Sequence, residues 1–596
     1  MYAYTDFDRQ FLRTRAAQYR DQLERNLRGE LADDAFRPLR LQNGWYIQRY
    51  APMLRVAVPY GEIASRQLRV LARIAREYDR PDAELLANAQ ATQDAIDPGY
   101  PAPKLKHGHG HFTTRTNVQF NWIPLDKSAD VMELLASVDM HGIQTSGNCI
   151  RNITSDALAG IAPDEIADPR PFCEILRQWS TLHPEFAFLP RKFKISINGA
   201  TEDRVAMGWY DVGLQLLRGA DGELGFRVQV GGGMGRTPII GSVIREFLPW
   251  QELLNYLEAV IRVYNRWGRR DNVWKARIKI LVKAERARYT EEVEQEYRAI
   301  VEQDGGPHRI TQAELDRVAA CFTVPVPAEP IDVDRKVAAI LRAAADEDPA
   351  FSRWLARNVA AHRLPQYRAV TLSFKRLGHA PGDATADQLD AAADLADRYS
   401  SGEARVTHEQ NLLLPWVPCD RLAELFQDAR RLGLASANIG LISDLIACPG
   451  GDYCSLANAR SIPVASALAE RFQDLDELDD LGPIDLHISG CINSCGHHHS
   501  GHIGILGVDK DGQEWYQVTL GGSDGSALSG QAGPGKVIGP SFAAAEVVEV
   551  VDAVLQTYVR ERAAGERFIA TLRRLGVEPF KTAANAVRHI TAREHA

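Results

Sequence analysis

Four cysteines near the end of the chain lie in two closely spaced pairs. Five residues separate Cys448 from Cys454, and three separate Cys491 from Cys495. Four thiolates supplied by two loops are the ligand set of a sulfur-rich metal site, which holds either zinc or an iron–sulfur cluster. Paired cysteines of structural zinc sites are usually closer in sequence, so the first spacing favours a cluster. Half of the chain's eight cysteines fall in these pairs, which argues against four unrelated buried thiols.

The two spacings, in this order, resemble those of the sulfite and nitrite reductases that contain sirohaem and a [4Fe–4S] cluster. The resemblance extends over nearly the whole chain and is greatest to the haemoprotein (beta) subunit of the bacterial assimilatory sulfite reductases. It implies that Cys448, Cys454, Cys491 and Cys495 bind the cluster. It also implies that Cys495 bridges the cluster to the sirohaem iron, so the expected cofactors are sirohaem and [4Fe–4S].

The composition is that of an ordinary globular protein. The 596 residues suggest about four domains. The net charge of −9 implies no general affinity for nucleic acid or anionic membranes, and no apolar run has transmembrane length. The polar start of the chain is not typical of a secretory signal, and eight cysteines in so long a chain are not a disulfide framework. We therefore expect a cytoplasmic protein.

The second half of the chain repeats the pattern of the first. A strand predicted over 369–374 and a helix predicted over 386–399 echo a strand at 53–59 and a helix at 65–78. The same order continues along the chain: 405–412 echoes 111–118, 483–489 echoes 190–196, and 516–522 echoes 226–232. The repeat predicts two copies of one architecture, with a cofactor between them contacted from both sides.

The resemblance implies an α+β fold in which a pseudo-twofold repeat relates two ferredoxin-like half-domains and two larger mixed α/β domains for the sirohaem and the cluster. The expected domains, in chain order, are an N-terminal helical arm (1–45), a first ferredoxin-like half-domain (46–127), a first sirohaem and substrate domain (128–330), a linker with the second half-domain (331–430), and a [4Fe–4S] and sirohaem domain (431–596).

Polar residues recur along one face of two predicted strands in the first copy. Arg115, Asn117 and Gln119 alternate along a strand predicted over 112–122, and Lys192 and Lys194 alternate along another. Because side chains two apart share one face of a strand, each set points one way. Such a face is either exposed to solvent or turned toward a bound anion.

Comparison of the two copies favours the anion site. The second copy has neutral or acidic residues where the first has basic ones: Glu409 matches Arg115, Asp485 matches Lys192, and His487 matches Lys194. We interpret the first copy as the one that binds an oxyanion and the second as the one that binds the cluster.

The resemblance assigns roles to these basic residues. Sirohaem carries many carboxylates, so its pocket needs Arg and Lys side chains, and the basic stretch 262–283 is either part of that pocket or a solvated helix face. The residues matching the family's cationic substrate site, and so expected to be catalytic, are Arg115, Arg151, Lys192 and Lys194. The residues expected to contact the cofactor are Cys495, Arg277, Lys279, Asn117 and Asn148.

Other segments are predicted from composition alone. Residues 11–31 are expected to form a polar helix, either packed on a subunit or solvated. Residues 81–107 are predicted to form an inserted surface loop, and the histidine-rich stretch 106–111 is interpreted as flexible and not as a metal site. Residues 289–334 are charged and include a Pro-rich segment at 324–327, which predicts a linker.

The expected function is the six-electron reduction of sulfite to sulfide in sulfur assimilation. Nitrite reduction to ammonia is the alternative, because both reactions share these motifs. A cluster-only electron-transfer protein or a zinc-structured binding protein is a more distant alternative, against which the basic residues of the first copy speak. The sequence contains no flavin or nicotinamide fingerprint, so electrons are expected from a partner, either ferredoxin or an NADPH flavoprotein subunit.

Overall fold

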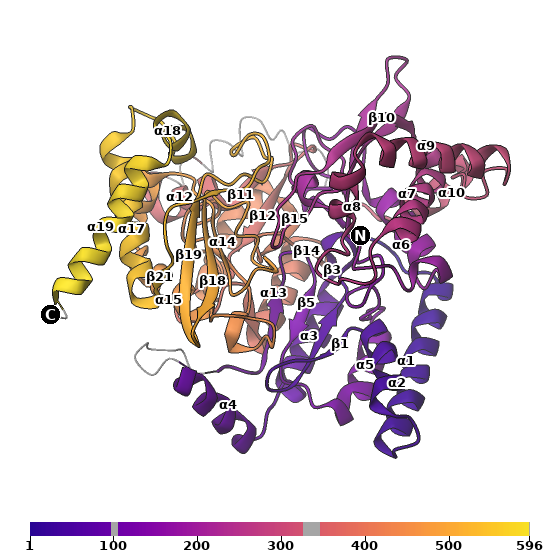
Figure 1. Ribbon diagram of the computed structural model, residues 1–596, viewed down its shortest axis with the longest axis horizontal. Helices are drawn as coiled ribbons and strands as arrows, with labels where there is room; N and C mark the ends of the chain where they lie inside the picture. The colour runs from indigo at the N-terminus through magenta and orange to yellow at the C-terminus, as the bar shows by residue number, and fades with distance from the viewer. Residues whose placement is uncertain (97–104, 326–341, 343–345, 595–596) are drawn as a thin grey trace.

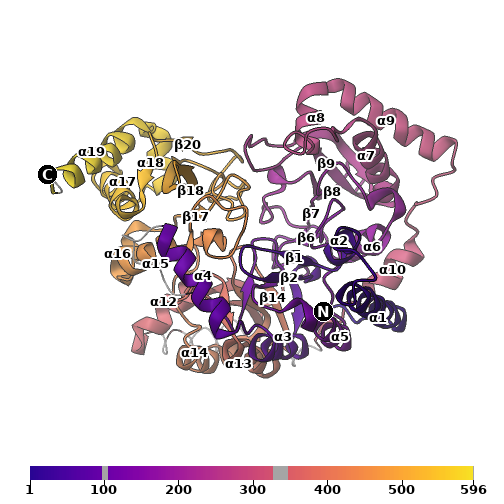
Figure 2. The same ribbon diagram turned by 60° about the horizontal axis from the view of Figure 1, so that its bottom comes forward.

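The computed structural model describes residues 1–96, 105–325, 342 and 346–594. The described strands form three five-stranded sheets and one six-stranded sheet. Two of the five-stranded sheets, called the smaller sheets because most of their strands are short, lie together with helices α3 (Ser65–Glu77) and α13 (Ala386–Tyr399). The other two sheets, called the larger sheets, belong to two units that stand on either side above them (Figures 1 and 2). The predicted α+β class with repeated units is confirmed.

The two smaller sheets exchange one strand each. The first has the order β1 (Trp45–Ile47), β2 (Pro52–Val56), β5 (Val118–Phe120), β4 (His109–Phe112) and β13 (Asp383–Thr385). The second has the order β11 (Val359–Ala361), β12 (Tyr367–Leu372), β15 (Leu412–Pro418), β14 (Glu403–Val406) and β3 (Glu62–Ala64). Because β13 pairs with β4 and β3 pairs with β14, each sheet is completed by the other copy.

Helices from both copies share one hydrophobic core with these sheets. They are α1 (Asp6–Leu27), α2 (Asp33–Gln42), α3 (Ser65–Glu77), α5 (Ser128–Ser137), α12 (Pro349–Asn358), α13 (Ala386–Tyr399) and α14 (Leu422–Arg431). The predicted polar helix corresponds to α1, which begins at a capping box on Thr5. Its buried Tyr19 lies 2.9 Å from the hydroxyl of Ser128 on α5, so α1 packs on the body of its own chain.

The two larger sheets repeat one topology. The first has the order β10 (Ser242–Pro249), β9 (Leu224–Val230), β8 (Val212–Arg218), β7 (Ile195–Asn198) and β6 (Thr154–Ser155). The second has the order β16 (Ile446–Ala447), β17 (Leu486–Ser489), β18 (Ile503–Lys510), β19 (Gln513–Leu520) and β20 (Lys536–Val537). A further strand, β21 (Phe542–Ala543), also pairs with β19. In each, two parallel pairings (β6–β7–β8 and β16–β17–β18) precede an antiparallel hairpin.

Helices cover each larger sheet and close its own core. On the first they are α6 (Arg170–Ser180), α7 (Leu253–Trp267), α8 (Ile278–Glu285), α9 (Ala287–Glu302) and α10 (Gln312–Ala319). On the second they are α15 (Ile462–Arg471), α16 (Leu475–Leu481), α17 (Val547–Glu561), α18 (Phe568–Leu575) and α19 (Glu578–Glu594).

The register of these sheets corrects one predicted match between the copies. Ile195 pairs with Val212 in the first sheet, and Leu486 pairs with Ile503 at the same place in the second. Lys194, and not Lys192, therefore corresponds to Asp485, while His487 corresponds to a serine. The sequence match was two residues out of register. A slip of two residues preserves the faces of a strand, which is why the alternation did not reveal it.

Three local predictions are also wrong. The predicted loop at 81–107 contains α4 (Ala83–Ile96), while 97–104 lie outside the described residues. The histidine-rich stretch is not flexible, because His109 and His111 lie buried in β4. The predicted strand at 112–122 is a hairpin, because a turn ending at Thr116, with φ of 56°, separates β4 from β5.

Helices also occupy much of the predicted linker. Residues 289–302 lie in α9 and 312–319 form α10, although composition had suggested an extended connection. The end of the predicted Pro-rich segment, from residue 326, lies outside the described residues.

Candidate active site

The two cysteine loops leave the same edge of the second larger sheet. Cys448 directly follows β16, and the loop carrying Cys491 and Cys495 directly follows β17. Because β16 and β17 are parallel neighbours, both loops begin at their carboxyl ends. The loops are bonded to each other: the amide of Gly490 donates to the Cys448 sulfur at 3.3 Å. A Cβ on Gly496 would lie 1.9 Å from the Ile488 carbonyl oxygen, so only glycine fits there.

The four predicted cluster ligands lie near enough for their charges to interact, but within the described residues no three of them are already arranged as a metal site. Burial first, and then the neighbouring Cys495, raise the pKa of the Cys448 thiol to about 12. Burial and then Cys495 likewise raise the pKa of Cys491 to about 11 and act in the same direction on Cys454. Three thiols whose ionisation is disfavoured by burial and by Cys495 need a bound cation to become thiolates together, and the iron of a cluster supplies that charge.

The four predicted catalytic cations also gather, from three segments. A β-bridge between Ile150 and Phe193 brings the Arg151 loop beside the two lysines, which lie directly before β7 and not in it, with the Arg151 amide donating to the Phe193 carbonyl at 2.7 Å. The Arg115 guanidinium reaches this loop from the β4–β5 turn and donates to the Asn152 carbonyl at 2.7 Å.

The mutual repulsion of these cations appears in their pKa values. Burial is the main cause that lowers the pKa of the Lys192 ammonium to about 7; Cys495 opposes this shift and three nearby arginines contribute to it. Burial lowers the pKa of Lys194 well below its ordinary value, and Arg115 and Lys192 add to this effect. The influence of Cys495 on Lys192 places the basic site beside the cysteine predicted to face the sirohaem.

Asp211, which the sequence analysis did not single out, organises this basic site. Its fully buried carboxylate accepts the guanidinium of Arg277 at 2.7 and 2.8 Å. The same carboxylate accepts the main-chain amide of Lys194 at 2.9 Å. The preceding residue, Tyr210, lies beneath the Arg115 guanidinium, 5.5 Å from ring centre to charge. The only signal in the sequence was an acidic residue directly before a strand, which is too common to be informative.

The residues predicted to contact the cofactor occupy different environments. The Asn117 side-chain oxygen is buried and accepts from the Val58 amide and from Asn152, so it joins two backbone segments. Asn148 is exposed, and its carbonyl accepts from the Leu189 amide at 2.8 Å. The Arg277 guanidinium already donates to the Asp211 carboxylate.

Lys279 holds the glycine-rich loop at 231–236. Its buried ammonium donates to the carbonyls of Gly233, Met234 and Thr237. This loop meets the second cysteine loop, because the His499 ring nitrogen donates to the Gly235 carbonyl at 2.9 Å. Lys279 therefore supports the surface where the first copy reaches the Cys495 loop.

The free donors of the basic site fit a carboxylate-rich cofactor and an oxyanion. Within the described ranges, the ammonium groups of Lys192 and Lys194 have no hydrogen-bond acceptor or ion-pair partner, and the buried Nε of Arg115 has no acceptor either. All three side chains are half-buried, and cationic donors that are withdrawn from water without an acceptor are costly unless a ligand satisfies them. The donor set and the four thiols therefore match the two expected cofactors.

Comparison with known proteins decides the family. The family model described as the nitrite and sulphite reductase 4Fe-4S domain matches residues 146–297 and 444–589, which together are half of the chain. The chain belongs to the nitrite and sulphite reductase family. A second model, the nitrite/sulfite reductase ferredoxin-like half domain, matches residues 371–432. This nitrite or sulphite reductase uses sirohaem and a [4Fe–4S] cluster, so the zinc and cluster-only alternatives are set aside.

Individual relatives of both kinds are equally similar to this reductase. Sulfite reductase [ferredoxin] 1 of Mycolicibacterium paratuberculosis is 27% identical, over 78% of this chain and 77% of its own. The ferredoxin–nitrite reductase of Synechococcus elongatus is 28% identical, over 79% of this chain and 80% of its own. The structure of Mycobacterium tuberculosis NirA protein covers 94% of this chain and 95% of its own, with a TM-score of 0.70 at 24% identity, and so shares the fold.

None of the helices in the described ranges is long and apolar enough to cross a lipid bilayer.

Proposed function

We propose that this reductase converts sulfite to sulfide in a six-electron reaction and takes its electrons from ferredoxin. The observation that carries the proposal is the set of four cations beside Cys495, two of which have free ammonium groups. Sulfite carries up to two negative charges on three oxygens, whereas nitrite carries one on two. Four convergent cations therefore complement sulfite more fully than nitrite.

The cations would bind and orient the oxyanion. The Arg151 guanidinium is pinned by the carbonyls of Thr145 and Gly147 at 2.7 and 2.8 Å, so it presents a fixed positive charge. The Arg115 guanidinium is fixed by Asn152 and Tyr210. Donors held in place before the substrate arrives need little reorganisation during the reaction.

The lysines would supply protons. Each substrate oxygen that leaves as water takes up protons, and an acid donates best when its pKa is near the working pH. The Lys192 Nζ, with a pKa lowered to about 7 by burial and nearby arginines, meets this condition. When bound, the sirohaem and the cluster supply the electrons and the iron that binds the substrate. Cys448, Cys454, Cys491 and Cys495 would hold the cluster, and Cys495 would face the sirohaem.

Nitrite reduction is the second candidate, since the ferredoxin–nitrite reductase relatives are as similar as the sulfite reductases. For the donor, these relatives are ferredoxin-dependent reductases, which supports ferredoxin, and an NADPH flavoprotein subunit is the alternative.

The test is a steady-state assay of the purified holoenzyme with reduced viologen dye, in parallel with sulfite and with nitrite. We expect a higher kcat/KM for sulfite, whereas a clear preference for nitrite would reverse the assignment. Replacing the dye by reduced ferredoxin should sustain sulfite reduction. If only NADPH with a flavoprotein reductase supports turnover, the proposed donor is wrong.

A further inference from the structure

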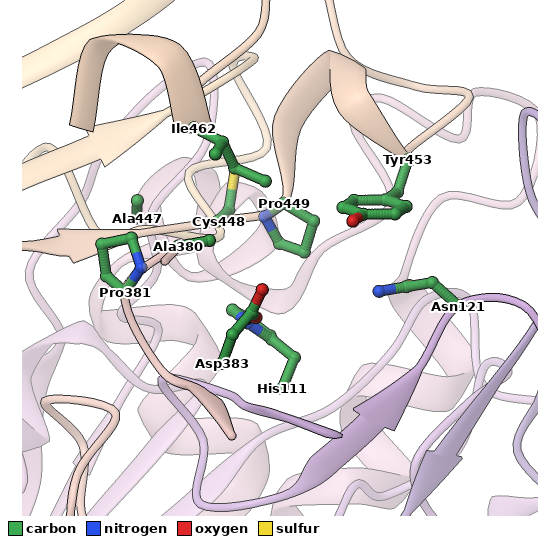
Figure 3. Close-up of a pocket in the computed structure, with 10 residues that line it drawn as sticks. All are labelled: His111, Asn121, Ala380, Pro381, Asp383, Ala447, Cys448, Pro449, Tyr453 and Ile462. Carbon is green, nitrogen blue, oxygen red and sulfur yellow. The ribbon is translucent and has the colours of Figure 1, made fainter. Parts of the chain in front are cut away.

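A buried chain of hydrogen bonds runs from the first half-domain to the first cluster cysteine. The His111 Nδ1 lies 2.8 Å from Asp383 Oδ1, and its Nε2 lies 3.1 Å from the amide nitrogen of Gln410. Gln410 in turn bonds the backbone of Ala447, the residue before Cys448. The three side chains and the residue Ala447 are all buried. Figure 3 shows His111 and Asp383 side by side, facing the loop of Cys448.

The directions of these bonds follow from the backbone groups at one end. The Ala447 amide can only donate, and it lies 3.1 Å from the Gln410 oxygen, so this oxygen is the acceptor. The two hydrogens of the Gln410 nitrogen face three acceptors: the carbonyls of Ala447 and Phe112, each at 3.0 Å, and His111 Nε2 at 3.1 Å. Because an amide nitrogen only donates, the contact with His111 runs from Gln410. The His111 Nε2 must accept, which leaves its proton on Nδ1, where it donates to Asp383.

The side chain of Gln410 bonds the free edge of β16, where a further strand would otherwise pair. The Cys448 amide donates to the Ile488 carbonyl at 3.2 Å, on the β17 side of β16. The amide and carbonyl of Ala447 point the other way, to the outer edge of the sheet, because backbone groups alternate along a strand. The single side-chain amide of Gln410 satisfies both groups, as a neighbouring strand would.

The equivalent position in the first copy shows that the turn itself does not require a glutamine. Thr116 corresponds to Gln410, since the bond from Thr113 to Asn117 matches the bond from Thr407 to Asn411. Both residues have a left-handed backbone, with φ of 56° and 63°. Within the described residues, however, the buried Thr116 hydroxyl has no partner. A long amide is therefore present only in the copy that carries the cluster.

The partners of Gln410 come from three parts of the fold. Asp383 lies on β13, the strand that the second copy donates to the first smaller sheet, and His111 lies opposite it on β4. His109, two residues earlier, also lies beside Asp383, with 3.2 Å between its Nε2 and Oδ2. Gln410 is thus held by both copies and reaches into the larger unit that carries the cysteines.

We propose that Gln410, oriented by His111 and Asp383, is a positioning residue for the cluster, which fixes the backbone at Ala447 and with it the direction of the Cys448 thiolate. Groups that orient metal ligands without touching the metal commonly change metal affinity by about 10- to 100-fold when they are replaced. The inference concerns the cluster and does not depend on which oxyanion the enzyme reduces.

The test compares Gln410→Asn with the counterpart Thr116→Asn in purified holoenzyme. Asparagine tolerates a left-handed backbone well, so at position 410 the main change is a reach too short for Ala447. The readouts are the rate at which an iron chelator bleaches the cluster, the EPR spectrum of the reduced cluster, and the melting temperature. We expect Gln410→Asn to lose its cluster about tenfold faster or more, with an altered EPR spectrum, and Thr116→Asn to lose it at the wild-type rate.

A wild-type bleaching rate and EPR spectrum in Gln410→Asn would overturn the proposal, as would equal acceleration in Thr116→Asn. His111→Leu provides the second variant, because it removes the support of Gln410 while leaving its amide in place. It should accelerate cluster loss in the same direction by a smaller factor. If Gln410→Asn does not accumulate as folded protein, His111→Leu decides, and a wild-type bleaching rate in that variant rejects the proposal.

Discussion

The Asp211 carboxylate and the Arg277 guanidinium form a forked ion pair in which the carboxylate is completely buried. The same carboxylate accepts the Lys194 amide, so the pair links the basic stretch 262–283 to the segment before β7 that carries the two lysines proposed to be catalytic. Arg277 was expected to contact the cofactor directly. Because its partner Asp211 also holds the Lys194 amide, Arg277 helps to fix the backbone of the basic site.

Replacing this carboxylate should destabilise the enzyme. Asp211→Asn leaves a buried guanidinium without its counter-charge, which costs about 3–5 kcal/mol of unfolding free energy. Glu246→Gln is the matched control, because Glu246 pairs with Arg227 on the surface, and exposed pairs contribute about 1 kcal/mol or less. Urea unfolding of both variants measures the difference. Equal midpoints would show that the buried pair does not support the fold.

Removing the ammonium of Lys192 or Lys194 should abolish catalysis and spare the fold. Neither ammonium has an acceptor within the described residues, so Lys192→Met and Lys194→Met break no internal bond. We expect the melting temperature and the sirohaem absorbance to stay near wild type, and sulfite reduction to fall about a hundredfold or more. Loss of the cofactor together with activity would instead assign these lysines to sirohaem binding.

The pH dependence of kcat/KM should report the Lys192 ammonium. Its pKa is lowered to about 7 by burial and by neighbouring arginines, so the charged form prevails below that pH and is lost as the pH rises through it. The carboxylates of bound sirohaem would move this pKa upward. We therefore expect kcat/KM to fall on the alkaline side of about pH 7. In Lys192→Arg the charge persists, and the fall should disappear; an unchanged profile in that variant would assign the fall to another group.

Iron analysis should return roughly five irons per chain, from one four-iron cluster and one sirohaem. Cys448→Ser should remove the four cluster irons and weaken folding of the C-terminal unit, because cluster binding and folding are coupled. Cys419→Ser is the control, since that buried thiol lies near the Pro365 carbonyl, away from the two loops. A Cys448→Ser variant with an intact cluster spectrum would place the ligands elsewhere.

The sequence was informative for those site residues that lie close together along the chain. Two cysteine spacings identified the cluster loops, and alternation identified the lysine pair. It failed where a residue depends on a distant partner: the buried His111 finds Asp383 at a separation of 272 residues, and Asp211 finds Arg277 across 66. A polar residue in a buried strand looks like a loop residue until its partner is known. The helix α4 was missed because the prolines around it suggested a loop.

The exchange of β3 and β13 gives this single chain the geometry of a domain-swapped dimer whose two subunits have been joined end to end. An ancestor with one copy per polypeptide would have completed its sheets only by pairing with a second molecule. If the present chain were divided between the two copies, each fragment would again lack one strand of its sheet. Each fragment would expose an unpaired strand edge, so the fragments should be recoverable only when they are produced together.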